Sequence, residues 1–272
     1  MEKRICIIII WIIFTLSGYA QINKTEQCLE KIPKQKMLFQ SPSNYKFTID
    51  WINRNIDGAV IMHNVAIGKL KQALPNDTIQ MQDITLTEIN NNVKNTIRID
   101  ELDGLKFKIS GDNFTNPDFY KHFPSNRVEL IRWFIQDKVA FDTYGQMYLD
   151  SLKLNIPFYP DFFQNHQANF EQYVNFNTKK LNLTWQGISK INNKNCVLIY
   201  FESMYNPINA DNDIMILDGR SCFWGHVWIS IDTRQIEYGT MNEDLIYKMK
   251  LKASDYEQQI NMQREIKLEN LQ

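Results

Sequence analysis

The chain of 272 residues carries 30 Lys and Arg against 31 Asp and Glu, and 44% of its residues are hydrophobic. A net charge of −1 gives no basic surface for a polyanion, which excludes nucleic acid as a partner on electrostatic grounds. Charged residues make up 22% of the chain, too few for a solvated disordered segment. The composition therefore predicts a globular protein with a sizeable core.

The N-terminus has the pattern of a secretory signal peptide. Two basic residues precede an apolar run at residues 5–16, and Gly18 and Ala20 occupy the −3 and −1 positions of a cut after Ala20. The run is shorter than the ~20 residues of a membrane-spanning helix, although an uncleaved anchor is the alternative. Tyr19 stands where a lipoprotein needs cysteine. We expect an exported, non-lipidated chain of residues 21–272 in the periplasm, on the cell surface or in the medium.

The mature chain is predicted to form a single domain, because no repeat, Pro-rich linker or charge block divides it. Residues 44–110 have the pattern of strands, with hydrophobic and polar residues alternating over residues 45–51. Asp103 and Gly104 lie between two alternating runs and supply the residues that a type I′ turn prefers. This predicts a hairpin over residues 96–109.

The centre of the chain, residues 117–178, is predicted to be helical and aromatic. Apolar residues fall on one helical face over residues 126–153, which indicates a helix or a broken pair of helices. Asn126 with Glu129 three residues later has the spacing of a capping box. An aromatic stretch without clear periodicity follows at residues 154–178.

Strand signals return over residues 181–272. The expected strands lie at residues 181–185, 196–201, 214–217, 222–231, 245–251 and 260–269. Asp218 and Gly219 are expected to form the turn between the third and fourth of these. Strands, a helical centre and more strands, without βαβ alternation, predict an α+β fold: a large curved antiparallel sheet, half-barrel-like, with the central helical segment packed on it. A two-sheet β-sandwich is the alternative.

Three stretches of the C-terminal third share a pattern with a known group of proteins. They are Trp185-Gln-Gly187 with the strand from Asn192 to Tyr200, the strand end Trp228-Ile-Ser-Ile-Asp232, and the closing strand Arg264-Glu-Ile-Lys-Leu-Glu269. Residues 181–272 thereby resemble envelope proteins built on a lipoprotein-carrier-like half-barrel, and uncharacterised secreted proteins of Gram-negative bacteria. The resemblance implies an envelope location and a non-catalytic fold with a concave, often apolar, binding face. It carries over no functional residue.

Motifs for metal or cofactor binding are missing at short spacing. The histidines are isolated from one another, at His63, His122, His166 and His226. No Cys-x-x-Cys pair or Gly-rich phosphate loop occurs. We therefore expect no metal and no cofactor.

The sequence also offers few arrangements of side chains that could be catalytic. Cys222, His226 and Asp232 share a strand face, but a rise of ~3.3 Å per residue separates them by ~13 and ~20 Å, too far for a hydrogen-bonded relay. The acids Glu88, Asp137, Glu202 and Asp232 are interpreted as surface or turn residues, although carboxylates that meet in space stay open.

The mature chain keeps three cysteines, Cys28, Cys196 and Cys222, in a compartment that permits disulfides. A disulfide that uses Cys28 and one that joins Cys196 to Cys222 are both open. Three buried thiols are the competing interpretation.

The most suggestive cluster lies at residues 223–228. A period of two places Trp224, His226 and Trp228 on one strand face, where two tryptophans flanking a histidine can form a stacking platform for a sugar or an apolar ligand. Phe162 and Phe163 are candidates for a lid over the same ligand. The alternative is that both strand faces are buried and these aromatics belong to the core.

The sequence as a whole predicts an exported, non-catalytic envelope protein. We expect it to bind a lipid or other apolar ligand, a glycan, or another envelope protein on a concave sheet face near Trp224, His226 and Trp228. The alternatives are an exported hydrolase with carboxylates assembled in space and a surface interaction module. After signal cleavage the chain is not expected to span a membrane, and its net charge of −2 offers no electrostatic partner of either sign.

Overall fold

The computed structural model describes residues 27, 28, 30, 32, 33, 43–74, 78–91, 93–109, 114, 116–164, 166–170, 174–213, 215–254 and 257–271. The predicted signal peptide, residues 1–20, lies outside these residues. The strands are β1 (Ser43–Arg54), β2 (Val60–Leu74), β3 (Thr78–Asn90), β4 (Val93–Arg98), β5 (Lys106–Phe107), β6 (His166–Phe170), β7 (Val174–Thr178), β8 (Leu181–Ile191), β9 (Lys194–Asp211), β10 (Met215–Ser230), β11 (Ile236–Leu251) and β12 (Glu257–Asn270). Between β5 and β6 lie α2 (Pro117–Tyr120), α3 (Val128–Asp142), a π-helical turn (Thr143–Met147) and the 3-10 turns Leu149–Ser151 and Asp161–Phe163.

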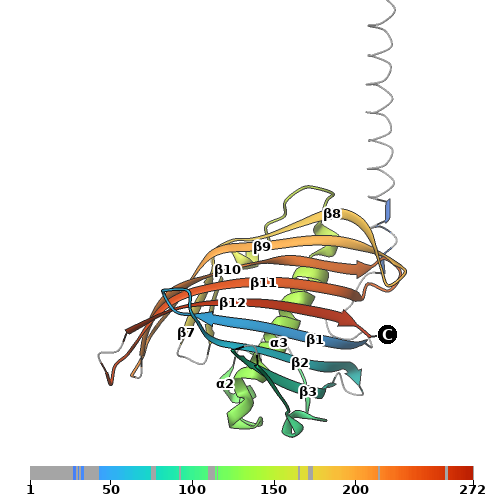
Figure 1. Ribbon diagram of the computed structural model, residues 1–272. Coiled ribbons are helices and arrows are strands. Elements are labelled where there is room, and N and C mark those ends of the chain that lie inside the picture. The colour runs from blue at the N-terminus through green and yellow to red at the C-terminus, as the bar shows by residue number, and fades with distance from the viewer. Residues whose placement is uncertain are drawn as a thin grey trace, which may run out of the picture.

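Within the described residues, the twelve strands form one sheet in the order β4-β3-β2-β1-β12-β11-β10-β9-β7-β6, with β5 paired to β3 and β8 paired to β9. The named pairings are antiparallel throughout. The sheet is curved, and α3 crosses its concave face at a steep angle to the strands (Figure 1). The predicted curved antiparallel sheet with a central helix is confirmed, and the two-sheet sandwich is not what forms.

The first and last described strands along the chain, β1 and β12, lie side by side in the middle of the sheet. β1 pairs with β12 from Tyr45 opposite Asn270 to Arg54 opposite Asn261. The N-terminal strands β1 to β4 and the C-terminal strands β8 to β12 therefore build one continuous surface. The closing strand, predicted from the period of two over residues 260–269, is the element that joins the two halves.

The concave face of the sheet is filled by α3. Phe134 and Phe141 are fully buried on this helix. Phe47 of β1 meets both rings, with centroids 6.0 and 6.4 Å away, and Phe201 of β9 meets Phe141 at 6.4 Å. Rings at these distances interlock edge to face or tilted, as in a packed protein core. The hollow of the sheet is thus the hydrophobic core of the protein.

Glycines let the helix approach the sheet closely. A Cβ atom at Gly239 of β11 would lie 2.7 Å from the ring of Phe141, and one at Gly145 in the π-helical turn would lie 2.8 Å from Val227 of β10. At Gly68 of β2 a Cβ would first meet the end of the Ile84 side chain on β3, 2.2 Å away, and then the ring of Phe134 at 3.1 Å. A side chain at Gly145 or Gly239 would push the helical segment away from the strands, and one at Gly68 would also displace Ile84.

The broken helix predicted over residues 126–153 is confirmed, since α3 continues into the π-helical turn and then a 3-10 turn. The predicted capping box is wrong. The helix begins after Arg127, whose side chain makes no capping hydrogen bond, and Asn126 lies inside a preceding 3-10 turn. Burial of the apolar face, rather than a cap, therefore stabilises this helix.

The predicted hairpin over residues 96–109 is wrong. β4 and β5 pair with β3 rather than with each other. Asp103 has a φ of −72° and Gly104 a φ of +79°, which is a type II rather than a type I′ turn. The turn returns the chain to the opposite end of β3.

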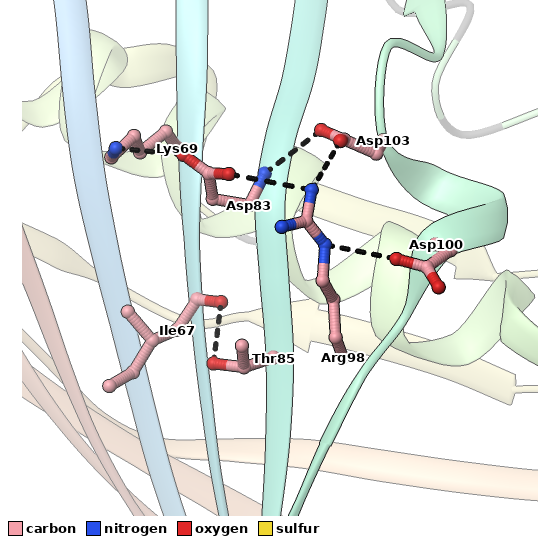
Figure 2. A network of polar contacts seen from close by, with 7 residues as sticks. All are labelled: Ile67, Lys69, Asp83, Thr85, Arg98, Asp100 and Asp103. Atoms are coloured by element: carbon pink, nitrogen blue, oxygen red, sulfur yellow. Dashed lines mark hydrogen bonds and ion pairs between the residues drawn. The ribbon is translucent and has the colours of Figure 1, made fainter.

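Polar contacts hold this turn against β3 (Figure 2). Arg98 lies 2.5 Å from Asp103, 2.9 Å from Asp100 and 3.6 Å from Asp83. The backbone N–H of Asp83 donates to Asp103 at 3.1 Å, and Lys69 of β2 lies 2.8 Å from Asp83. The side chain of Asp103 is thereby hydrogen-bonded to β3. The Asp-Gly pair alone does not predict this contact, because its partner lies on another strand.

The expected turn at Asp218 and Gly219 is also wrong. Both residues lie inside β10, which runs unbroken from Met215 to Ser230. A Cβ atom at Gly219 would come within 2.5 Å of the backbone oxygen of Ile246. The glycine is required by the close approach of β11 and not by a turn.

Cys196 and Cys222 carry free thiols. Cys196 lies opposite Ser230 in the β9–β10 pairing, eight residues along the strand from Cys222. Burial raises the pKa of the Cys196 thiol to about 11. A disulfide between these two cysteines is therefore ruled out by the register.

Replacing Gly239 tests whether close helix approach supports the fold. We expect Gly239→Ala to lower the free energy of unfolding by about 1–3 kcal/mol, because the methyl group overpacks against the buried ring of Phe141. Denaturant unfolding measures the loss. The double variant Gly239→Ala/Phe141→Leu should lose less than the sum of the two single variants, because the smaller side chain makes room. Strictly additive losses would contradict this account.

Candidate functional site

The predicted ligand residues of β10 lie on the outer face of the sheet. Along this strand Phe223, Val227 and their alternate neighbours are buried, and Val227 lies against Gly145 of the helical segment. Trp224, His226 and Trp228 alternate with them and are half-buried. Because neighbouring side chains of a strand point to opposite faces, these three face away from α3. The expectation that they line the concave face is wrong, because α3 occupies that face.

On the outer face, four aromatic side chains form a row, here called the aromatic row: Tyr200, His226, Trp228 and Tyr238. The centroids of successive rings are 5.2, 5.7 and 5.3 Å apart, and the rings are tilted by 40–58°. Tyr200 of β9 lies directly opposite His226, and Tyr238 of β11 lies directly opposite Trp228. The row therefore crosses three strands diagonally.

The aromatic row is bordered by hydrogen-bonding side chains. Glu202 lies opposite Trp224 and accepts a hydrogen bond from the Tyr200 hydroxyl at 2.8 Å and from Asn182 at 3.0 Å. Thr240 lies opposite His226 on β11. Carboxylate, amide and hydroxyl groups thus lie beside the rings of Tyr200 and His226.

Burial sets the protonation of this surface. Desolvation, with a further contribution from the Glu202 carboxylate, raises the pKa of Tyr200 to about 12. Desolvation also lowers the pKa of His226 below its usual value. The imidazole of His226 is therefore neutral at pH 7, and the row presents uncharged rings.

The predicted lid residues lie elsewhere. Phe163 packs against Tyr144 and Tyr148, with ring centroids 6.0 and 6.3 Å away. Tyr144 in turn stacks on Phe223, an inner-face residue of β10, at 5.7 Å and 6°. Phe162 touches Phe163 at 5.0 Å but is 61% exposed. Phe162 and Phe163 therefore lie on the helix side of the sheet and not over the aromatic row.

Sequence reasoning missed a buried charge cluster beneath α3. Arg264 of β12 donates to Asp137 of α3 at 2.6 Å and to Glu243 of β11 at 2.6 Å. The guanidinium also lies over the ring of Trp133, 5.0 Å from its centroid. Ser221 donates to Glu243 at 2.7 Å. Asp137 was interpreted from the sequence as a surface or turn acid, but it is buried. The sequence signal for its burial is its position at the edge of the apolar face of the predicted helix.

The two carboxylates of this cluster share one guanidinium. Desolvation raises the pKa of Asp137 to about 6, and the nearby Glu243 charge adds to the rise, although Arg264 opposes it. A general acid–base pair has to reach a substrate, whereas Asp137 and Arg264 are 5% and 10% exposed as side chains. The arrangement is that of an ion-pair network that docks the helix, and it gives no support to a hydrolase.

The acidity of Asp137 can be measured through stability. Its folded-state pKa, about 6, exceeds the ordinary value of ~3.9, so its contribution to stability is present below pH ~4 and is lost as the pH rises through 6. We expect the difference in unfolding free energy between the wild type and Asp137→Asn to fall by about 2 kcal/mol between pH 4 and pH 7. Denaturant unfolding across that range measures it. A difference that rises with pH would mean that Arg264 holds Asp137 ionised.

No group of three or more His, Cys, Asp or Glu side chains that could hold a metal ion occurs in the part of the chain that the structure describes. His63 of β2 lies 3.0 Å from Asp50 of β1. His122 lies at the other end of the sheet order from His226, next to β5. Among the described side chains, His63, His122 and His226 lie on different elements and do not come together.

Comparisons with known proteins assign this chain to no family. No protein-family model matches the sequence, and no curated protein matches it. A solved structure of lipid–protein interactions in lipovitellin is similar to this chain, with 12% sequence identity and a TM-score of 0.34. The alignment covers 86% of this chain and 25% of the lipovitellin chain. Within the described residues, no helix is long and apolar enough to cross a membrane.

Proposed function

We propose that the protein is an exported, non-catalytic binding protein whose aromatic row binds carbohydrate. The observation that carries this proposal is the row itself: four rings in contact, half-buried, on a sheet face that the core does not use. The C–H groups on the face of a sugar ring stack on aromatic faces, and aromatic side chains supply rigid contact area at low entropic cost.

The border of the row supports a sugar over other ligands. A glycan needs hydrogen-bond partners for its hydroxyl groups, and Glu202, Asn182 and Thr240 supply acceptors and donors beside the rings. The centre of a protein interface is typically apolar and depleted of charged residues. A neutral His226 between two larger rings suits an uncharged ligand.

The export part of the proposal rests on the sequence. The apolar run at residues 5–16 with the small residues Gly18 and Ala20 is the pattern that signal peptidase recognises. We expect the chain, expressed with this segment in a Gram-negative host, to be recovered outside the cytoplasm with Gln21 as its first residue. N-terminal sequencing of the recovered protein measures this. A chain that keeps residues 1–20 in the membrane fraction would favour the anchor alternative.

Binding to the aromatic row is tested with soluble oligosaccharides. Cellohexaose, chitohexaose and maltohexaose are titrated against the mature chain, with tryptophan fluorescence and calorimetry as readouts. Stacking of a base on an aromatic ring is worth about 1–3 kcal/mol. By analogy we expect Trp228→Ala to weaken binding of the recognised oligosaccharide ~10-fold or more, since 1.4 kcal/mol is tenfold in Kd.

Phe162→Ala provides the matched control. It removes a more exposed ring on the helix side of the sheet, and we expect it to leave oligosaccharide binding unchanged. Equal losses from Trp228→Ala and Phe162→Ala would mean that the row is not the site. If none of the oligosaccharides binds, the proposal of carbohydrate recognition is wrong, and a surface interaction module becomes the favoured function.

A further inference from the structure

A cavity of 390 Å³ lies between β5 and α2, far from the aromatic row in the order of the sheet. Among the described residues that line it are Leu105, Lys106, Phe107, Lys108, Asn116, Asp118, Phe119, His122 and Phe123. Its volume falls in the range of small-molecule sites, roughly 300–1,000 Å³. α2 and β3, the strand that carries β5, lie close together at one end of the molecule (Figure 1).

Aromatic side chains form the apolar part of the cavity. Phe107 is 8% exposed and is fixed by the pairing of β5 with β3. Its ring contacts those of Phe119 and Phe123, with centroids 6.3 and 5.9 Å away, and these two rings lie 5.4 Å from each other. A preformed wall of this kind removes the apolar surface of a ligand from water, which favours binding.

The rim of the cavity is basic. Lys106 and Lys108 flank Phe107 and are exposed, as is His122. The one acidic residue among the lining residues given above, Asp118, forms an ion pair with Lys121 at 2.5 Å. The lining residues given above thus carry two lysines against one carboxylate, a positive balance in a protein whose net charge is close to zero.

From the aromatic wall and the basic rim, we infer that this cavity binds an amphipathic anion, an acyl or alkyl chain with a carboxylate or phosphate head. The chain lies against Phe107, Phe119 and Phe123, and the head lies beside Lys106 and Lys108. The site is separate from the aromatic row and does not depend on the carbohydrate proposal.

Three probes with the same twelve-carbon chain separate the head from the tail: dodecanoate, dodecyl phosphate and dodecanol. Calorimetry with the mature chain should give 1:1 binding of at least one anionic probe, tighter than that of dodecanol. Lys106→Glu/Lys108→Glu should weaken the anionic probe ~10-fold or more and leave dodecanol unchanged. Stronger binding of dodecyl phosphate would point to a lipid phosphate as the source, and stronger binding of dodecanoate to a free fatty acid.

The controls locate the site. Lys94→Glu/Lys190→Glu makes the same charge change at exposed lysines of β4 and β8, and we expect wild-type binding. Leu105→Trp fills the cavity and should abolish binding of all three probes while Trp228→Ala leaves it intact; unfolding curves check that each variant is folded. The inference is overturned if no anionic probe binds, if Lys106→Glu/Lys108→Glu binds as the wild type does, or if both lysine pairs lose equally.

Discussion

The fold depends on the packing of one helix into the hollow of one sheet. A curved sheet of this size presents a single large apolar face, and α3 is the element that covers its centre, with Phe134 and Phe141 fully buried. The fit requires glycine where helix and strands approach most closely, at Gly68, Gly145 and Gly239. Because the core of a protein is close-packed, the helix has little freedom to rise without leaving a void. The position of α3 therefore determines which surfaces remain for a ligand.

Ion pairs hold the helical segment in one position on this apolar sheet face. Arg264 joins Asp137 of α3 to Glu243 of β11, and Arg234 holds the end of the helical segment through Asp150 at 2.8 and 3.1 Å. Apolar contacts alone tolerate sliding, whereas an ion pair removed from water is costly unless its geometry is met. Burying Arg264, Asp137 and Glu243 costs desolvation energy, so we expect their pairing to affect where the helix sits more than how stable the protein is. The raised pKa of Asp137 is accounted for by its burial within this ion-pair network, and it does not by itself mark a catalytic site.

The period of two predicted much of the fold, because it reports directly which strand residues face the core. It found the C-terminal strands and separated Phe223 and Val227 from Trp224, His226 and Trp228. It could not say which of the two faces is concave, since that depends on where α3 packs. The two Asp-Gly pairs failed for a related reason. Gly219 is needed for the close approach of β11, and the Asp103 side chain accepts a hydrogen bond from the backbone of Asp83 on β3; both partners lie on other strands, far from the pair in the sequence. Asp137 was missed because its partner Arg264 lies 127 residues away.

A filled hollow changes where binding has to be sought. In a half-barrel with an open interior, the concave face is the natural site, and the resemblance of residues 181–272 to carriers implied one. Here the interior is occupied by side chains of α3, and among the described residues a cavity with an aromatic wall lies instead at one end of the sheet, beside α2. The outer face of the sheet can bind only ligands that do not need a pocket. The aromatic row suits such ligands, since stacking requires an accessible ring with polar groups beside it. The two groups of aromatic residues therefore differ in their setting: Phe107, Phe119 and Phe123 line a cavity that opens at one end of the sheet, whereas the aromatic row lies on the outer face.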